Sequence, residues 1–251
     1  MPSHAARDFG VQSFCFRHCQ DNAEVAQMVK QIGLSKIEVC DVHADFTDLD
    51  GWKKIVDTYQ AEGVDVVSIG VQTFRGEPVE EKWLDSARAA GAEHVSAHFT
   101  VDTFREAVPL TAKRAADRGL KIGVHCHGGY MFGGQPDVLA HLLELGGEAV
   151  GVNLDTAWCM QIGPKHGKPV EWVKDRFPGR VYGVHYKDFV FDPNGKWNDV
   201  IVGQGNLDLP ALIGALDETG FDGMAVIEYE ADVENPVPAL KRCVDSMRAV
   251  G

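Results

Sequence analysis

The sequence predicts an α/β protein, a single (β/α)8 TIM barrel that spans residues 1–251. Three observations support this prediction. Eight short apolar runs alternate with eight amphipathic segments, and the runs begin roughly 25–30 residues apart until a last gap of about 40. Most runs are rich in β-branched residues and several are nearly continuously apolar, as parallel strands covered by helices are. The chain has the length of such a barrel and shows no linker or low-complexity tract.

The apolar runs are expected to form the eight strands in chain order. An open doubly wound sheet is the alternative, but no GxGxxG motif follows the first run. The expected strands lie at residues 9–16, 36–42, 64–71, 94–99, 121–127, 150–156, 181–189 and 224–230.

The segments between the runs are expected to form helices. They carry apolar residues at helical spacing, and most of them end at a glycine, which is a common helix stop signal. The longest connection, residues 190–208, is expected to be an irregular loop with a turn at Asp192-Pro-Asn-Gly195. The expected helices cover residues 22–34, 52–63, 80–92, 104–120, 136–147, 170–179, 209–221 and 237–250.

Amino-acid composition and net charge indicate which kinds of molecule the protein is expected to bind. Hydrophobic residues make up 45% of the chain and charged residues 24%, as in a globular protein with a sizeable core. The formal net charge of −13 opposes binding to nucleic acid and to anionic membranes, so a small molecule is the expected partner. Six scattered cysteines form no CxxC pair, and the first residues show no apolar signal core. Both features predict reduced thiols in a cytoplasmic protein.

Polar side chains gather where the expected strands end. A barrel enzyme builds its site at these carboxyl ends, and an ionised group among apolar strand residues is costly unless it is paired or bound to metal. Residues two apart on a strand share a face, so His125 and His127 point the same way. The polar strand-end residues are Glu38, His43, His98, His125, His127, Asn153, Asp155, His185, Lys187, Asp188, Glu228 and Glu230.

Four of these residues form a candidate metal site. His125, Asp155, His185 and Glu228 come from four consecutive expected strands and supply two imidazoles and two carboxylates. This donor set suits one divalent ion such as Mn²⁺, Co²⁺, Fe²⁺ or Zn²⁺ better than an all-oxygen Mg²⁺ site. We expect Mn²⁺ foremost and keep Mg²⁺ as an alternative. Asp155 has a competing structural interpretation as the N-cap of the helix that follows it.

Motifs in the second half of the chain resemble a known family. The stretches "VHCHGG", "NLDTAW", "VHYKD" and "VGQGNLDLPALIGALDETGFDGMAVIEYE" occur in order. Together they resemble the xylose-isomerase-like TIM-barrel superfamily of sugar phosphate isomerases and epimerases, inosose dehydratases and endonuclease IV. Relatives often hold metal with Glu, Asp, His and Glu. The last three match Asp155, His185 and Glu228, whereas the first falls on His125, a departure that looks more like the inosose dehydratase branch.

The resemblance implies proton abstraction next to a carbonyl through a metal-stabilised enediolate. We expect a divalent-metal-dependent sugar isomerase or epimerase. A lyase or dehydratase acting on an inosose or a 3-keto-glycoside is the alternative, because His125 removes one glutamate of the two-base epimerase pair. An endonuclease IV-like enzyme and a non-catalytic sugar-binding barrel are further alternatives. Relatives often form homodimers or homotetramers.

The expected roles follow from the same comparison. His127 matches a family histidine that commonly contacts substrate, and burial or neighbours can tune His127 or Lys187 towards acid–base work. Glu38 and Lys187 also have interpretations as scaffold. The Gly203-Gln204-Gly205 loop can offer backbone donors, but this pattern is too weak to predict a phosphorylated substrate. The expected catalytic residues are Glu228, His127 and Lys187, and the expected substrate contacts are Glu38, His43, His98, His127, Trp158 and Arg17.

Overall fold

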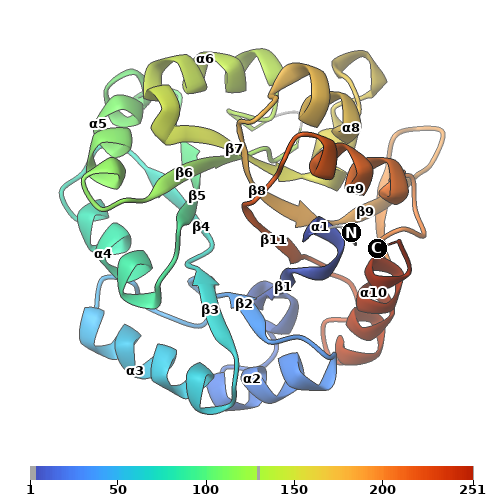
Figure 1. The fold of residues 1–251 in the computed structure, drawn as a ribbon, viewed down its shortest axis with the longest axis horizontal. Helices are drawn as coiled ribbons and strands as arrows, with labels where there is room; N and C mark the ends of the chain where they lie inside the picture. The colour runs from blue at the N-terminus through green and yellow to red at the C-terminus, as the bar shows by residue number, and fades with distance from the viewer. Residues whose placement is uncertain (1–3, 129–130, 251) are drawn as a thin grey trace.

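A curled parallel sheet forms the centre of the protein, and helices surround it (Figure 1). The computed structural model describes residues 4–128 and 131–250, so Gly129 of the "VHCHGG" motif lies outside the described residues. The expected TIM-barrel fold is confirmed. The strands of the sheet are β1 (Phe9–Gln12), β2 (Lys36–Glu38), β3 (Asp65–Ser68), β4 (Val71–Phe74), β5 (His94–Phe99), β6 (Lys121–His125), β7 (Val150–Asp155), β8 (Val181–Tyr186) and β11 (Met224–Ile227).

The order of the strands explains how the sheet curls round on itself. It runs β3-β2-β1-β11-β8-β7-β6-β5-β4, and every neighbouring pair is parallel. The two end strands, β3 and β4, follow one another in the chain and are separated only by Ile69 and Gly70. Gly70 has φ +69°, a left-handed conformation that interrupts the strand. The single strand expected at residues 64–71 therefore corresponds to β3 and the first residue of β4, which continues beyond the expected end to Phe74.

The helices confirm most of the expected segments. Gly91 ends α4 with φ +82°, as the glycine stop signals predict. The segment expected as one helix at 170–179 is instead α8 followed by a π-helical turn at Trp172–Arg176. The helices are α1 (His4–Arg7), α2 (Asn22–Gln31), α3 (Leu49–Ala61), α4 (Glu80–Ala90), α5 (Phe104–Ala116), α6 (Pro136–Gly146), α7 (Thr156–Gln161), α8 (Pro169–Glu171), α9 (Leu209–Glu218) and α10 (Val237–Val250). In the described part of the chain, no helix has the length and apolar character that crossing a membrane requires.

The longest connection differs from its prediction. The sequence predicted an irregular loop here, but part of the segment forms an antiparallel hairpin of β9 (Asp188–Phe191) and β10 (Trp197–Val200). The turn expected at Asp192–Gly195 is confirmed, because the Gly195 amide donates to the Asp192 carbonyl at 3.0 Å. The hairpin follows β8 directly and therefore stands beside the carboxyl ends of the barrel strands.

Candidate metal centre

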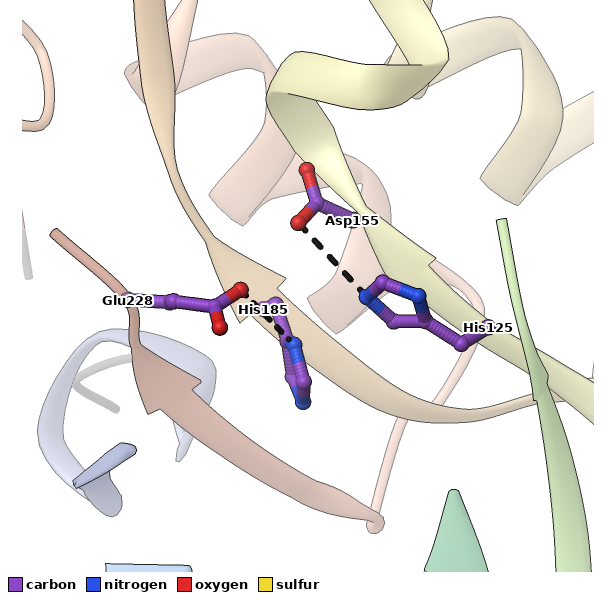
Figure 2. A group of neighbouring side chains, drawn as sticks. All are labelled: His125, Asp155, His185 and Glu228. Atoms are coloured by element: carbon purple, nitrogen blue, oxygen red, sulfur yellow. Dashed lines mark hydrogen bonds and ion pairs between the residues drawn. The ribbon is translucent and has the colours of Figure 1, made fainter. Parts of the chain in front are cut away.

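Four side chains from adjacent strands converge at the carboxyl end of the barrel (Figure 2). His125 ends β6, Asp155 ends β7, His185 lies in β8, and Glu228 follows β11. One ligand atom from each residue lies within 4.8 Å of those of the other three. The structure thus brings together the four residues that the sequence predicts as metal ligands.

The donor atoms themselves fit a cation. His125 Nε2 and Asp155 Oδ2 lie 3.6 Å apart, and within the described residues neither atom has a hydrogen-bond partner although both are buried. Buried polar atoms without partners are rare in folded proteins because each loses its hydration. A divalent ion held between them would satisfy both atoms at once, and two imidazoles with two carboxylates are a suitable donor set.

Asp155 caps a helix, as one interpretation of its sequence position predicts, and is placed for the predicted metal-ligand role as well. Its Oδ1 accepts the amide protons of Ala157 at 3.0 Å and Trp158 at 2.9 Å, and so caps α7. Its Oδ2 is left to face His125. Burial raises the pKa of Asp155 to about 6, although the Lys187 ammonium opposes this shift. The end of β7 therefore fixes one oxygen structurally and presents the other to the site.

His125 is held by a second imidazole. Its Nδ1 lies 3.2 Å from Nε2 of His98, which comes from the neighbouring strand β5. If Nε2 of His125 presents its lone pair to a cation, Nδ1 carries the proton and donates it to His98. Burial, assisted by repulsion from His185, lowers the pKa of His125 well below its ordinary value. His98, expected as a substrate contact, instead has its Nε2 engaged in orienting His125.

His185 lies between two carboxylates. Its Nε2 is 2.9 Å from Glu38 Oε1, and its Nδ1 is 3.2 Å from Glu228 Oε2. Burial would raise the pKa of Glu38, but the His185 ring holds it below its ordinary value. Glu38 also accepts a hydrogen bond from Gln12 at 2.7 Å and is almost fully buried. Glu38, expected at the substrate, instead lies behind His185, in the position of a carboxylate that orients a ligand histidine.

A buried lysine lies among three carboxylates at the barrel mouth. Lys187 is 1% exposed and pairs with Glu230, while its Nζ lies 3.8 Å from Asp199 Oδ2 and 3.9 Å from Glu228 Oε2. Burial alone would lower the pKa of Lys187, but the surrounding carboxylates outweigh it and raise that pKa. On sequence grounds we expect burial or neighbours to bring the pKa of Lys187 closer to neutral pH. The structure indicates the opposite direction, so Lys187 stays an ammonium.

Asp199 is the one member of this cluster that the sequence did not predict. It lies on β10 and accepts the Glu230 amide proton at 2.7 Å. The available signal was its spacing of two residues from Trp197, which places both side chains on one face of a strand. That signal has meaning only once the segment is known to be a strand.

An aromatic row extends from the ligands to the hairpin. The His127 ring stacks on Trp158 at 4.5 Å between centroids, and Trp158 meets Phe189 and Trp197 edge-on. His127 Nδ1 is buried and has no hydrogen-bond partner in the described structure. A Cβ on Gly128 would lie 3.2 Å from the Trp158 ring, so the glycine after His127 makes room for this stack.

Two other expected substrate contacts are engaged by the protein. His43 places Nδ1 3.0 Å from Ser13 Oγ and Nε2 2.9 Å from the Cys19 carbonyl. Arg17 donates to the carbonyls of Phe14 and Glu230. These contacts tie together the loops after β1, β2 and β11. Both residues therefore bind protein atoms at the barrel mouth, and their role as substrate contacts stays a prediction.

The backbone donors of the Gly203-Gln204-Gly205 loop are also used internally. The amides of Gly203 and Gly205 donate to Asp188 Oδ2 at 3.0 and 2.8 Å, and the Leu207 amide donates to Oδ1 at 3.0 Å. A Cβ at Gly205 would overlap the Asp188 carboxylate. The glycine pair accordingly binds the protein's own carboxylate and anchors the base of the hairpin.

A separate cavity of about 730 Å³ lies at the opposite end of the barrel. First residues of the strands line it, among them Lys36, Asp65, His94 and Lys121. It does not include any of the four converging ligands. The four candidate metal ligands therefore lie away from this cavity, at the carboxyl end of the barrel strands.

Comparison with known proteins agrees with this architecture. The model of a family described as a xylose isomerase-like TIM barrel matches residues 26–250. The chain belongs to this family. A search of curated proteins found no match.

Solved structures of family-like barrels cover the whole chain at low identity. A xylose isomerase-like TIM-barrel protein of Mycobacterium smegmatis in complex with magnesium is 14% identical, with a TM-score of 0.76 over 100% of this chain and 99% of its own. The 3-keto-D-glucoside 4-epimerase of E. coli is 16% identical, with 0.72 over 96% and 99%. A probable 3-DHS dehydratase of Bacillus anthracis is 14% identical, with 0.71 over 95% and 97%. At these identities the likeness shows the fold alone.

Proposed function

We propose that the protein is a divalent-metal-dependent isomerase or epimerase that moves a proton next to the carbonyl of a sugar or cyclitol. The convergence of His125, Asp155, His185 and Glu228, with two unpartnered donor atoms among them, carries the proposal. A divalent ion held by these residues would polarise the substrate carbonyl and so acidify the neighbouring C–H bond. Mn²⁺ remains our expected ion, and a magnesium complex of a similar barrel supports divalent binding.

The remaining groups supply proton transfer. Burial would raise the pKa of Glu228, but Lys187 and His185 hold it below its ordinary value, so Glu228 stays a carboxylate able to accept a proton. His127 has a buried, unpartnered Nδ1 close to the ligand His125, and can exchange a proton with the substrate. Lys187, kept charged, can donate to a substrate oxygen beside Glu228.

A lyase reaction in the same site is the second candidate. Elimination of a β-oxygen is helped by a donor beside the leaving group, and the buried Lys187 ammonium can stabilise the departing oxygen by its charge, although its raised pKa makes it a weak acid. The similarity to a probable dehydratase supports this candidate, as the similarity to an epimerase supports the first. DNA repair is not proposed, because within the described residues we find one four-residue cluster and not a multi-metal ligand set.

The test combines solvent exchange with a matched pair of variants. Metal-loaded protein is incubated in D₂O with keto-sugars, inososes and 3-keto-glycosides. Carbon-bound deuterium in an intact skeleton indicates isomerisation or epimerisation, whereas loss of water or an aglycone indicates elimination. Asp155→Asn should abolish metal binding and turnover but keep the α7 cap, since asparagine caps helices well, whereas Asp155→Ala should lose stability too. Full turnover in a metal-free preparation would overturn the proposal.

A further inference from the structure

The β9–β10 hairpin turns one face towards the ligand cluster. Trp197 pairs with Phe191 and Asp199 with Phe189 across the antiparallel ladder, so these four side chains share a face. Asp199 on this face accepts the Glu230 amide proton, which ties the hairpin to the chain just beyond Glu228. The other face carries Val190, which is 41% exposed, and Asn198 opposite it.

The inward face continues the aromatic row that begins at the ligands. Trp197 stacks on Phe189 with centroids 5.9 Å apart and meets Trp158 edge-on at 5.3 Å. Trp158 in turn stacks on His127, two residues from the ligand His125. Trp197 is 39% exposed, so it offers surface beyond the row. A flat aromatic surface close to a polar site is suited to the C–H face of a substrate ring.

Groups near the site that could recognise a phosphate are engaged by the protein. The Gly203 and Gly205 amides bind Asp188, and the Arg17 guanidinium binds two carbonyls. The Lys187 ammonium is surrounded by carboxylates. A phosphate dianion binding to the glycine amides or to Lys187 would have to displace one of these contacts, and Arg17 would offer only the N–H groups that its two carbonyl contacts leave.

The charge of the mouth works against a dianion as well. Glu228, Glu230 and Asp199 surround the buried Lys187 ammonium, and Asp155 adds a further carboxyl at the ligand cluster. Even with a divalent ion balancing Asp155 and Glu228, the carboxylates of Glu38 and Glu230 outnumber the Lys187 ammonium. A phosphate dianion next to them would lose hydration and gain repulsion. A neutral polyol instead brings hydroxyl groups that these carboxylates can accept.

We propose that the site takes an uncharged, ring-closed polyol or keto-polyol and discriminates against its phosphate esters, with Trp197 as the hairpin residue that contacts the ring. This inference rests on the proposed function for the location of the site, and adds the charge and shape of the substrate. It concerns binding, so it can be tested whether or not turnover is found.

The test is calorimetric titration of the Mn²⁺-loaded protein with matched pairs. The probes are myo-inositol with myo-inositol 1-phosphate, and methyl glucoside with glucose 6-phosphate. The neutral member of at least one pair should bind at least about tenfold more tightly than its ester. Equal or tighter binding of the esters, or binding of neither neutral ring, would overturn the inference.

Variants of the hairpin separate the ring contact from general damage. Trp197→Ala should weaken binding of the neutral ring by roughly two- to tenfold, as expected for loss of one aromatic contact, and Trp197→Phe should restore most of it. Val190→Ala, on the outward face of the same hairpin, is the control and should leave affinity unchanged. Unchanged affinity in Trp197→Ala would refute the role of Trp197. If the protein turned over only phosphate esters, this inference would be overturned but the proposed function would stand. If it bound neutral rings selectively but caused no deuterium exchange, this inference would stand and the proposed function would be overturned.

Discussion

Replacement of Lys187 by methionine should destabilise the metal-free protein strongly. The substitution keeps the side-chain length but leaves the carboxylates of Asp199, Glu228 and Glu230 without their shared cation. Separations of 3.8 and 3.9 Å correspond to about 4 kcal/mol for each of the first two pairs at an effective dielectric constant of about 20. Methionine also avoids the desolvation of a buried ammonium, so the net loss should be about 3–5 kcal/mol, the usual cost of breaking a buried pair.

The loss should depend on pH in a definite direction. Burial already raises the pKa of Asp199 to about 7 against the opposing effect of Lys187, and removal of the ammonium raises it further. A carboxyl group whose pKa is higher in the folded than in the unfolded state stabilises the fold at low pH, and this contribution is lost as pH rises. The deficit of Lys187→Met relative to the unmodified protein should therefore be larger at about pH 7.5 than at about pH 5.

Urea unfolding of metal-free protein at both pH values measures this deficit. Lys113→Met is the matched control, because Lys113 pairs with Asp117 at 2.8 Å but is 74% exposed, and it should cost less than about 0.5 kcal/mol. Adding Asp199→Asn to Lys187→Met should recover part of the loss, since one uncompensated charge is removed. Equal losses for the two lysine variants, or a deficit independent of pH, would refute the reasoning.

Three further predictions concern the orientation of a ligand, the hairpin and a buried histidine. Glu38→Gln should weaken metal binding by roughly 10- to 100-fold in a chelator competition, because His185 loses its anionic partner; unchanged affinity would count against that role. Gly205→Ala should lower the free energy of unfolding in urea by about 1–3 kcal/mol, because the new methyl group overlaps Asp188. Gly214→Ala, with open space around it in α9, should raise that free energy by up to about 1 kcal/mol. Similar effects at both sites would contradict the packing argument. Burial lowers the pKa of His94 to about 4, so as pH falls from about 6.5 to 4 the unfolded chain takes up a proton at His94 before the folded chain does. This difference should destabilise the fold by roughly 3 kcal/mol over that range, and His94→Gln should abolish that part of the pH dependence. An unchanged pH dependence would show that His94 does not contribute.

The strand-end residues show how much of the site the sequence predicts. Alternation along each strand fixes which side chains face inwards, and the barrel brings the carboxyl ends together, so His125, Asp155, His185 and Glu228 meet as expected. Partners of individual nitrogens are not encoded in this way. His98 faces the mouth as predicted, but its contact with His125 Nδ1 depends on the side-chain rotamers of both rings.

The hairpin marks the limit of sequence patterns. Its turn at Asp192–Gly195 is visible in the sequence, but the flanking residues do not alternate cleanly between apolar and polar. Its pairing depends on contacts with residues distant in the chain, including the Trp158 ring and the Glu230 amide. Asp199 was missed for the same reason, since its role exists only after the hairpin is placed.

In the resemblance described above, many relatives carry a glutamate where this chain has His125, and that difference would affect the charge of the site and the route of the proton. If His125 and His185 bind a divalent ion as neutral imidazoles, the carboxylates of Asp155 and Glu228 give the four ligands a charge of −2, which the ion brings to −2 + 2 = 0. A glutamate at position 125 would leave −1 instead. On the β6 side the ligand is therefore an imidazole whose Nδ1 is already engaged by His98, and it cannot exchange protons as a free carboxylate does. On that side the group with an unpartnered nitrogen is His127, through Nδ1, whereas the Lys187 ammonium lies beside Glu228. Under the proposed function, we therefore do not expect a symmetrical exchange between two ligand carboxylates at this site. Return of the proton to carbon would give epimerisation, whereas protonation and loss of the β-oxygen would give elimination.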